Sequence, residues 1–219
     1  MSRVIPSSVP ATWYVVVGRA GSTGCTNKAI RPLPDGSTCL GRAVQIGRQL
    51  GRVIVSTDYP RSVWAPPRGV SVVARPPELA TSGARMLDVL ADVAVRANLM
   101  RDDRIVLLQA TSPMRSAETV YACLQAARES RKSCCTAMRY PHTWHPRYVL
   151  ESGAVMPACR QELAPCYRPD GGAYVGTVRQ ILTGSWGDFG WVVSPPGESL
   201  SIDDPSDWLE ACRRVKEGA

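Results

Sequence analysis

Short apolar runs alternate along this chain with longer stretches in which apolar residues recur every three or four positions. The short runs are rich in β-branched residues and are bounded by turn-forming residues, a pattern typical of buried β-strands. They span residues 13–17, 52–56, 70–73, 104–108 and 133–138. Strands that are apolar on both faces belong in a mainly parallel sheet that is covered on both sides.

The stretches between these strands have the period of an amphipathic helix. They span residues 39–50, 82–98 and 117–130. In the second stretch Met86, Leu90 and Val93 fall on one face. Ser116 is placed to cap the third helix, because its hydroxyl can accept a hydrogen bond from a backbone N–H one turn later. The alternation predicts an α/β fold with an open, mainly parallel sheet and helices on both faces.

This regular pattern breaks between residues 140 and 170. Trp144, Tyr148 and Tyr167 are scattered there among prolines at positions 141, 146, 157, 165 and 169. We interpret the segment as an arm inserted into a single domain that occupies the whole chain. An arm of this kind is a common place for a dimer contact or a substrate lid.

Regular structure is expected to resume after the arm. Short strands are predicted at residues 172–178 and 190–193, followed by a closing helix over about residues 205–216. Pro205 suits the first turn of that helix, where a missing N–H costs nothing.

The net charge of +7 rests mainly on arginines that are spread along the chain. A nucleic-acid-binding protein usually shows a basic stripe interleaved with aromatic residues. We therefore favour small anionic substrates, met by single arginines in loops, over nucleic acid. Nucleic-acid binding remains an alternative, and it would be sensitive to salt.

No apolar run approaches the roughly 20 residues of a membrane span, and the N-terminus has no apolar signal region. We expect a cytoplasmic protein with no membrane partner. The eight cysteines form no Cys-x-x-Cys pair, so we expect them to be reduced and to pack as small apolar residues.

The loop after the first strand carries the strongest chemical signal. It holds glycines at positions 18, 21 and 24, and Arg19 and Lys28 bracket it with positive charge. Free backbone N–H groups and nearby cations suit the phosphates of a nucleotide. The loop is neither a P-loop nor a dinucleotide fingerprint, and by itself an ordinary surface turn would explain it equally well.

In parallel sheets, ligands bind beyond the carboxyl ends of the strands. The polar loops that follow the predicted strands should therefore line one crevice. They cover residues 18–28, 56–61, 74–82 and 109–115.

Five segments, taken together, resemble the acylneuraminate cytidylyltransferase family, the CMP–sialic acid synthetases and their relatives. The most specific is Leu107-Leu-Gln-Ala-Thr-Ser-Pro-Met-Arg115. The others are the loop at 18–24 with Lys28, the Val-Ser-Thr-Asp stretch ending at Asp58, residues 75–80, and residues 167–174 with the closing Ser201-Ile-Asp203.

The resemblance implies the Rossmann-like sheet of nucleotidyltransferases and a Mg²⁺-dependent (or Mn²⁺-dependent) enzyme. Members of the family join the anomeric hydroxyl of a 2-keto sugar acid to the α-phosphate of CTP and release pyrophosphate. The partners implied are CTP, an anionic sugar-acid acceptor and a second copy of the chain, which would pair through the arm at about residues 140–170.

The resemblance also implies roles for individual residues. Arg19, Lys28 and Asp203 are the expected catalytic residues, and Asp203 is the expected metal ligand. The nucleotide is expected to contact Gly18, Arg19, Ala20, Gly21, Ser22, Lys28 and Arg75. The acceptor is expected to contact Gln109, Thr111, Ser112, Arg115 and Arg168.

Several positions depart from the family pattern. Ser201 stands where the closing motif has its first aspartate, Ala29 replaces an asparagine, and Thr23 replaces a lysine. Three alternatives therefore stay open. The chain could activate a phosphonate or another unusual acid, it could be a non-catalytic nucleotide-binding relative, and Asp203 could merely cap the last helix.

Overall fold

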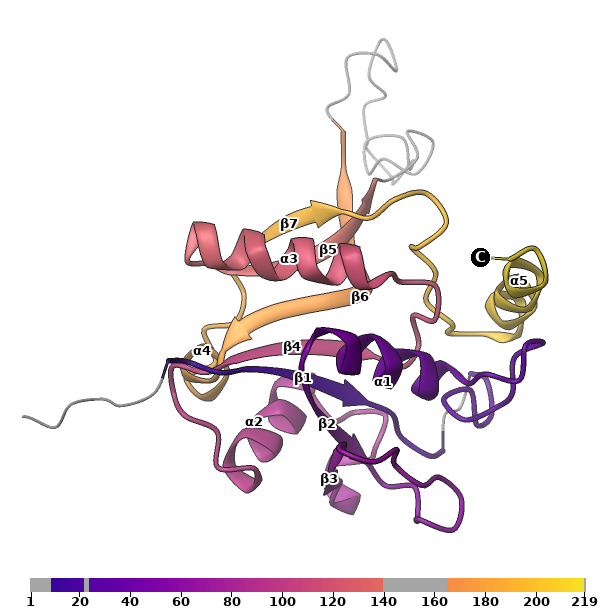
Figure 1. The fold of residues 1–219 in the computed structure, drawn as a ribbon, viewed down its shortest axis with the longest axis horizontal. Coiled ribbons are helices and arrows are strands. Elements are labelled where there is room, and N and C mark those ends of the chain that lie inside the picture. Colours follow the sequence, from indigo (N-terminus) through magenta and orange to yellow (C-terminus); the bar gives the residue numbers. More distant parts are fainter. Residues whose placement is uncertain (1–8, 22–23, 140–164, 219) are drawn as a thin grey trace, which may run out of the picture.

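The computed structural model describes residues 9–21, 24–139 and 165–218 (Figure 1). Their strands form one seven-stranded sheet in the order β3-β2-β1-β4-β6-β5-β7. The strands are β1 (Thr12–Val17), β2 (Arg52–Thr57), β3 (Ser71–Ala74), β4 (Arg104–Gln109), β5 (Ser133–Arg139), β6 (Tyr167–Thr177) and β7 (Phe189–Val193). Only β6 runs antiparallel to its neighbours among these strands, so the predicted mainly parallel sheet is confirmed.

Two apolar layers cover the sheet, as the two-sided strands require. The helices are α1 (Cys39–Leu50), α2 (Met86–Arg96), α3 (Ala117–Ser130), α4 (Val178–Leu182) and α5 (Pro205–Lys216), with a short 3₁₀ turn at Pro77–Leu79. Helices α1 and α3 pack on one face, and α2 and α4 pack on the other (Figure 1). None of the described helices is long and apolar enough to cross a lipid bilayer.

A third apolar cluster lies beside the sheet and fixes the last helix. Trp208 and Ala211 of α5 pack there with Leu33 and Cys39, which flank the start of α1. This packing brings the segment before α5 next to the loop that follows β1 (Figure 1).

Helix α2 differs from the expected helix at both ends, and the short helix α4 was not expected from the sequence. Helix α2 begins at Met86 rather than near Ser82, since Arg85 still has extended backbone with φ of −72° and ψ of 139°. It ends at Arg96, since Asn98 adopts a left-handed backbone with φ of 51°. The predicted Ser116 cap is confirmed, because its hydroxyl accepts from Thr119 N, and Pro205 lies in the first turn of α5 as expected.

The expected arm is shorter at its C-terminal end than the proline pattern suggests. Tyr167 and Arg168 already belong to β6, where they pair with Arg139 and Met138 of β5. A proline in the run, Pro169, is tolerated opposite the register shift between Cys135 and Ala137. Residues 140–164 of the predicted arm, with Trp144 and Tyr148, lie outside the described residues.

Candidate active site

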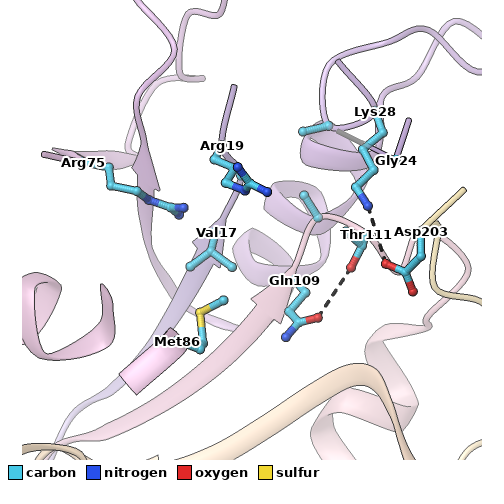
Figure 2. Close-up of a pocket in the computed structure, with 12 residues that line it drawn as sticks. Val17, Arg19, Gly24, Lys28, Arg75, Met86, Gln109, Thr111 and Asp203 are labelled. Carbon is cyan, nitrogen blue, oxygen red and sulfur yellow. Dashed lines mark hydrogen bonds and ion pairs between the residues drawn. The ribbon is translucent and has the colours of Figure 1, made fainter. Parts of the chain in front are cut away.

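A cavity of about 400 Å³ opens at the carboxyl edge of the parallel strands (Figure 2). Strands β1 and β4 both end there, and the segment before α5 closes one side. The lining residues are Val17, Gly18, Arg19, Gly24, Lys28, Ala29, Arg75, Met86, Gln109, Ala110, Thr111 and Asp203. The prediction that the loops after the strands meet in one crevice is therefore confirmed for the loops after β1, β3 and β4.

The loop after β1 is fixed by its neighbour strand β2. Gly18 N donates to Ser56 O at 3.2 Å, and Ala20 N donates to the Asp58 carboxylate at 2.7 Å. Gly21 then adopts a φ of 68°, which favours glycine. Asp58 thus holds the loop in place. This role could not be predicted from the sequence, because it depends on β2 lying beside β1. Ser22 lies outside the described residues.

Two arginines project toward the cavity, Arg19 from the loop after β1 and Arg75 from the loop after β3 (Figure 2). Arg19 donates through one nitrogen to the carbonyls of Gly21 and Ala80, both at 3.3 Å. Arg75 is buried and donates to Ser56 O at 2.9 Å and to Ser56 Oγ at 3.2 Å. Burial lowers the pKa of Arg75, and the nearby Asp58 carboxylate partly offsets that shift, so the guanidinium stays charged.

Lys28 joins this loop to the segment before α5. Its ammonium donates to Ile202 O and lies 3.5 Å from the Asp203 carboxylate (Figure 2). The Asp203 side chain is 75% exposed, whereas that of Lys28 is 13% exposed. Arg19, Lys28 and Arg75 therefore put three cations around a cavity whose described acidic lining is Asp203.

The helix-capping alternative for Asp203 is excluded by its neighbour. Asp204 is the N-cap of α5, because its carboxylate accepts from Ser206 N at 2.7 Å and from Asp207 N at 3.0 Å. The Asp207 carboxylate in turn accepts from Asp203 N and Asp204 N. These bonds hold the backbone in place and leave the Asp203 carboxylate to the cavity.

Asp203 fits one particular kind of metal site. The described residues contain no group of three or more histidine, cysteine, aspartate or glutamate side chains that could enclose a metal ion. Mg²⁺ is commonly held by one or two carboxylates together with substrate phosphates. The exposed Asp203 carboxylate lines the same cavity as Arg19, Lys28 and Arg75, so its surroundings fit a metal ion of this kind.

Gln109, the last residue of β4, and Thr111, in the turn after it, form the wall opposite Arg75 (Figure 2). The Thr111 hydroxyl lies 3.5 Å from Gln109 Oε1. That distance is at the limit of a hydrogen bond, so both groups can turn toward a ligand. Neutral donors and acceptors of this kind suit a polyhydroxylated molecule.

The structure does not bring Ser112, Arg115 and Arg168 to this cavity. Ser112 and Arg115 are 2% and 5% exposed, and the Arg115 guanidinium donates to the carbonyls of Ser112 and Gln109. It shapes the turn after β4 instead of facing a ligand. Arg168 lies on β6, with its Nε 3.2 Å from Met138 Sδ. Of the five residues expected to contact the acceptor, Gln109 and Thr111 line the cavity.

A family model described as cytidylyltransferase matches residues 14–157. This chain belongs to the cytidylyltransferase family. The CMP-N,N'-diacetyllegionaminic acid synthase of Legionella pneumophila is 26% identical over 213 residues, covering 89% of this chain and 91% of that protein.

Solved structures show the same fold at low identity. A CMP:2-keto-3-deoxy-manno-octonic acid synthetase complexed with CTP has a TM-score of 0.70 at 14% identity, covering 95% of this chain and 100% of the other. The 4-diphosphocytidyl-2C-methyl-D-erythritol synthase of Anaerococcus prevotii has a TM-score of 0.63 at 12% identity, covering 94% and 96%. The cytidylyltransferase thus has the nucleotidyltransferase fold that its sequence implies.

One buried carboxylate of this cytidylyltransferase was not singled out from the sequence. Asp170 accepts from the hydroxyls of Thr136, Ser194 and Ser199 and from Gly172 N. Burial would raise the pKa of Asp170, but these hydrogen bonds outweigh it and hold the pKa below its usual range. The network joins β5 and β6 to the segment that leads to Asp203. The signal in the sequence that could have indicated Asp170 is its position directly before Gly171 and Gly172.

We expect Asp170→Asn to lower the free energy of unfolding by about 1–3 kcal/mol near neutral pH, because the amide turns a donor toward buried hydroxyl donors. A depressed native pKa contributes stability above the unfolded value of about 3.9, and that contribution is lost as the pH falls through the native pKa. The difference from wild type should therefore shrink below about pH 4. Denaturant unfolding at several pH values measures it. The exposed Asp188→Asn is the control, with a change within about 0.5 kcal/mol.

We expect Gly24→Ala to lower the turnover of the cytidylyltransferase by about tenfold while the fold persists. A Cβ at Gly24 would overlap the backbone carbonyl oxygen of Asp203, so the loop or the Asp203 segment must move. Gly83→Ala is the matched control, since a Cβ there meets nothing and its backbone is unstrained. Steady-state kinetics with a thermal unfolding check measure the effect. Wild-type kinetics for Gly24→Ala would show that the two segments need not touch.

Proposed function

We propose that this cytidylyltransferase transfers the cytidylyl group of CTP to an acidic sugar or sugar-acid-like acceptor and releases pyrophosphate. The observation that carries the proposal is the convergence of Arg19, Lys28 and Arg75 on one cavity. Three cations match a triphosphate, whose charge must be neutralised as it moves toward the leaving pyrophosphate. The loop with Gly18 and Gly21 would supply backbone N–H groups to the same phosphates.

The acceptor is proposed from the relatives and from the neutral wall of the cavity. The Legionella protein is named as a synthase of a CMP-legionaminic acid derivative. The solved structure with the TM-score of 0.70 is named as a synthetase for an octonic acid. Both acceptors are acidic sugars. Gln109 and Thr111 would bind the hydroxyls of such a molecule, while nearby cations attract its carboxylate.

In the proposed reaction the anomeric hydroxyl oxygen of the acceptor attacks the α-phosphorus of CTP, and the hydroxyl proton passes to solvent. The bond from that phosphorus to the bridging oxygen breaks, and pyrophosphate leaves in line. Arg19 and Lys28 would stabilise the negative charge on the leaving group, and Arg75 would fix the nucleotide. No covalent intermediate with the protein is needed. Mg²⁺, held by Asp203 and the phosphates, would supply further charge stabilisation when bound.

A pyrophosphate-release assay tests the function. Purified protein is offered each of the four nucleoside triphosphates with a panel of keto-sugar acids and phosphonates, with and without Mg²⁺ or Mn²⁺. We expect release with CTP, a sugar acid and metal together. Turnover only with a phosphonate would favour that acceptor class, and CTP binding without release would favour a non-catalytic relative. We place the enzyme in the cytoplasm, where CTP is available.

We also propose that the enzyme is a homodimer. Tyr167, Trp191 and Val193 are 40%, 58% and 47% exposed, and the Tyr167 and Trp191 rings lie 6.0 Å apart. Trp191 and Val193 belong to β7, the last strand at one edge of the sheet. The patch adjoins in sequence the predicted arm, so the two together would form the contact. Two-fold pairing is the commonest way to cover such a surface.

We expect sedimentation to give about twice the 23.7 kDa mass of one chain. Trp191→Glu should disperse the dimer, because a buried charge at the contact is costly. Leu209→Glu, which alters an even more exposed apolar residue on α5, should not. A concentration-independent single-chain mass for the wild type would rule the dimer out.

A further inference from the structure

A second charged cavity lies at the end of the sheet where β4 begins, opposite the end that holds the active site. Its volume is about 290 Å³, and it is bounded by the start of β4, the end of α3 and the junction of β6 with α4. Four cationic residues line it: Arg104, Arg128, Arg131 and Lys132. Among the described residues that line it, none is acidic.

Arg104 is the residue that local structure does not explain. It is the first residue of β4 and is half-buried, and within the described part of the chain its side chain forms no hydrogen bond or ion pair. Burial lowers the pKa of Arg104, and the positive charge of Arg128 lowers it further. The fold therefore places two guanidinium groups near each other without a carboxylate between them.

The other three cations have a partial explanation in the helix dipole. Arg128 lies in the last turn of α3, and Arg131 and Lys132 follow it, where positive charge is favoured by about 0.3–1 kcal/mol each. Arg104 is outside this helix, so the dipole does not account for it. Arg128 is oriented by neutral partners, Gln125 Oε1 at 3.1 Å and Thr12 Oγ1 at 3.3 Å.

The charge of this cluster is only weakly compensated. Lys132 pairs with Asp188 at 3.1 Å, but both side chains are more than half exposed. Such surface pairs are easily exchanged for another anion. Arginine is the cation best suited to a phosphate, because its planar fork binds two oxygens at once.

We propose that this cavity is a binding site for a small oxyanion with two or more negative charges, such as inorganic pyrophosphate or a phosphate ester. Its limited volume and the walls formed by Thr177 and Gln180 favour a compact anion over a nucleic-acid strand. Strand β4 runs from Arg104 to Gln109, so the cavity lies roughly 17 Å from the active site at about 3.3 Å per residue. The proposal is independent of the acceptor that the enzyme uses.

Calorimetric titration with inorganic pyrophosphate, without divalent metal and at constant ionic strength, tests this proposal. The wild-type protein should show two binding events. The double variant R104Q/R128Q should weaken binding at the second cavity by about tenfold or more. Lys28→Ala should weaken binding at the active site. Arg48→Gln is the matched control, because Arg48 holds the same position in the last turn of α1. Circular dichroism verifies that each variant is folded.

The outcomes separate the alternatives. A single event in the wild type that Lys28→Ala removes, or a double variant that binds like the wild type, would overturn the proposal and leave the cluster as helix-dipole compensation. Tight binding of a single-stranded oligonucleotide that depends on Arg104, with no pyrophosphate event there, would overturn it in favour of a nucleic-acid surface. Unchanged basal turnover in the double variant would support two separate sites.

Discussion

Replacing Asp203 with asparagine should lower turnover on the order of 100-fold, with the fold intact. The amide keeps the size of the side chain but loses the charge that a hard divalent cation requires. Because the Asp203 side chain is 75% exposed and caps no helix, its loss should cost little stability. Pyrophosphate release at saturating CTP and acceptor, over a range of Mg²⁺ concentrations, measures the effect.

Asp204→Asn provides the control for that experiment. Asp204 caps α5, and asparagine is also a good cap, so both stability and turnover should change little. Near wild-type turnover of Asp203→Asn across all metal concentrations would remove the metal assignment. A gain in metal affinity on Ser201→Asp would show that the missing second carboxylate is a real deficit.

Replacing Lys28 with alanine should weaken CTP binding by about 1.5–3 kcal/mol, or roughly 10- to 150-fold, and leave CMP binding nearly unchanged. Lys28 lies at the end of the cavity that Asp203 borders, where the distal phosphates are proposed to lie. A monophosphate would not extend to it. Calorimetric titration of CTP and CMP into the wild type and the variant measures the difference.

Lys216→Ala is a suitable control for Lys28→Ala, because Lys216 is exposed at the end of α5 and lines no part of the cavity. It should leave the affinity for both nucleotides unchanged. Equal weakening of CTP and CMP by Lys28→Ala, or no weakening, would place the triphosphate elsewhere.

Several features of this protein could be predicted from local sequence. The bounds of α1, α3 and α5 follow from apolar spacing and from signals within one turn, such as the Ser116 cap and Pro205 at the first helical position. The composition of the loop after β1 could also be recognised, because its small residues and flanking cations lie within eleven positions of one another. These features depend on contacts between near neighbours in the chain.

Other features depended on which distant segments pack together. Ser112 and Arg115 stand in the most family-specific motif, yet the turn after β4 buries both, while Gln109 and Thr111 reach the cavity. The choice between Asp203 and Asp204 as the helix cap was likewise made by backbone direction at the start of α5. Adjacent residues differ in role because side-chain direction is fixed by packing.

The sequence by itself determined the α/β class, the cytidylyltransferase resemblance and the cations that flank the loop after β1. Only the tertiary structure decided that Asp58 anchors that loop and that Asp170 joins β5 and β6 to the Asp203 segment. It also decided that Arg104 and Arg128 line one cavity. These residues lie 24 or more positions from their partners. Contacts over such separations arise from strand order and helix packing. The local pattern of apolar and polar residues predicts neither of these.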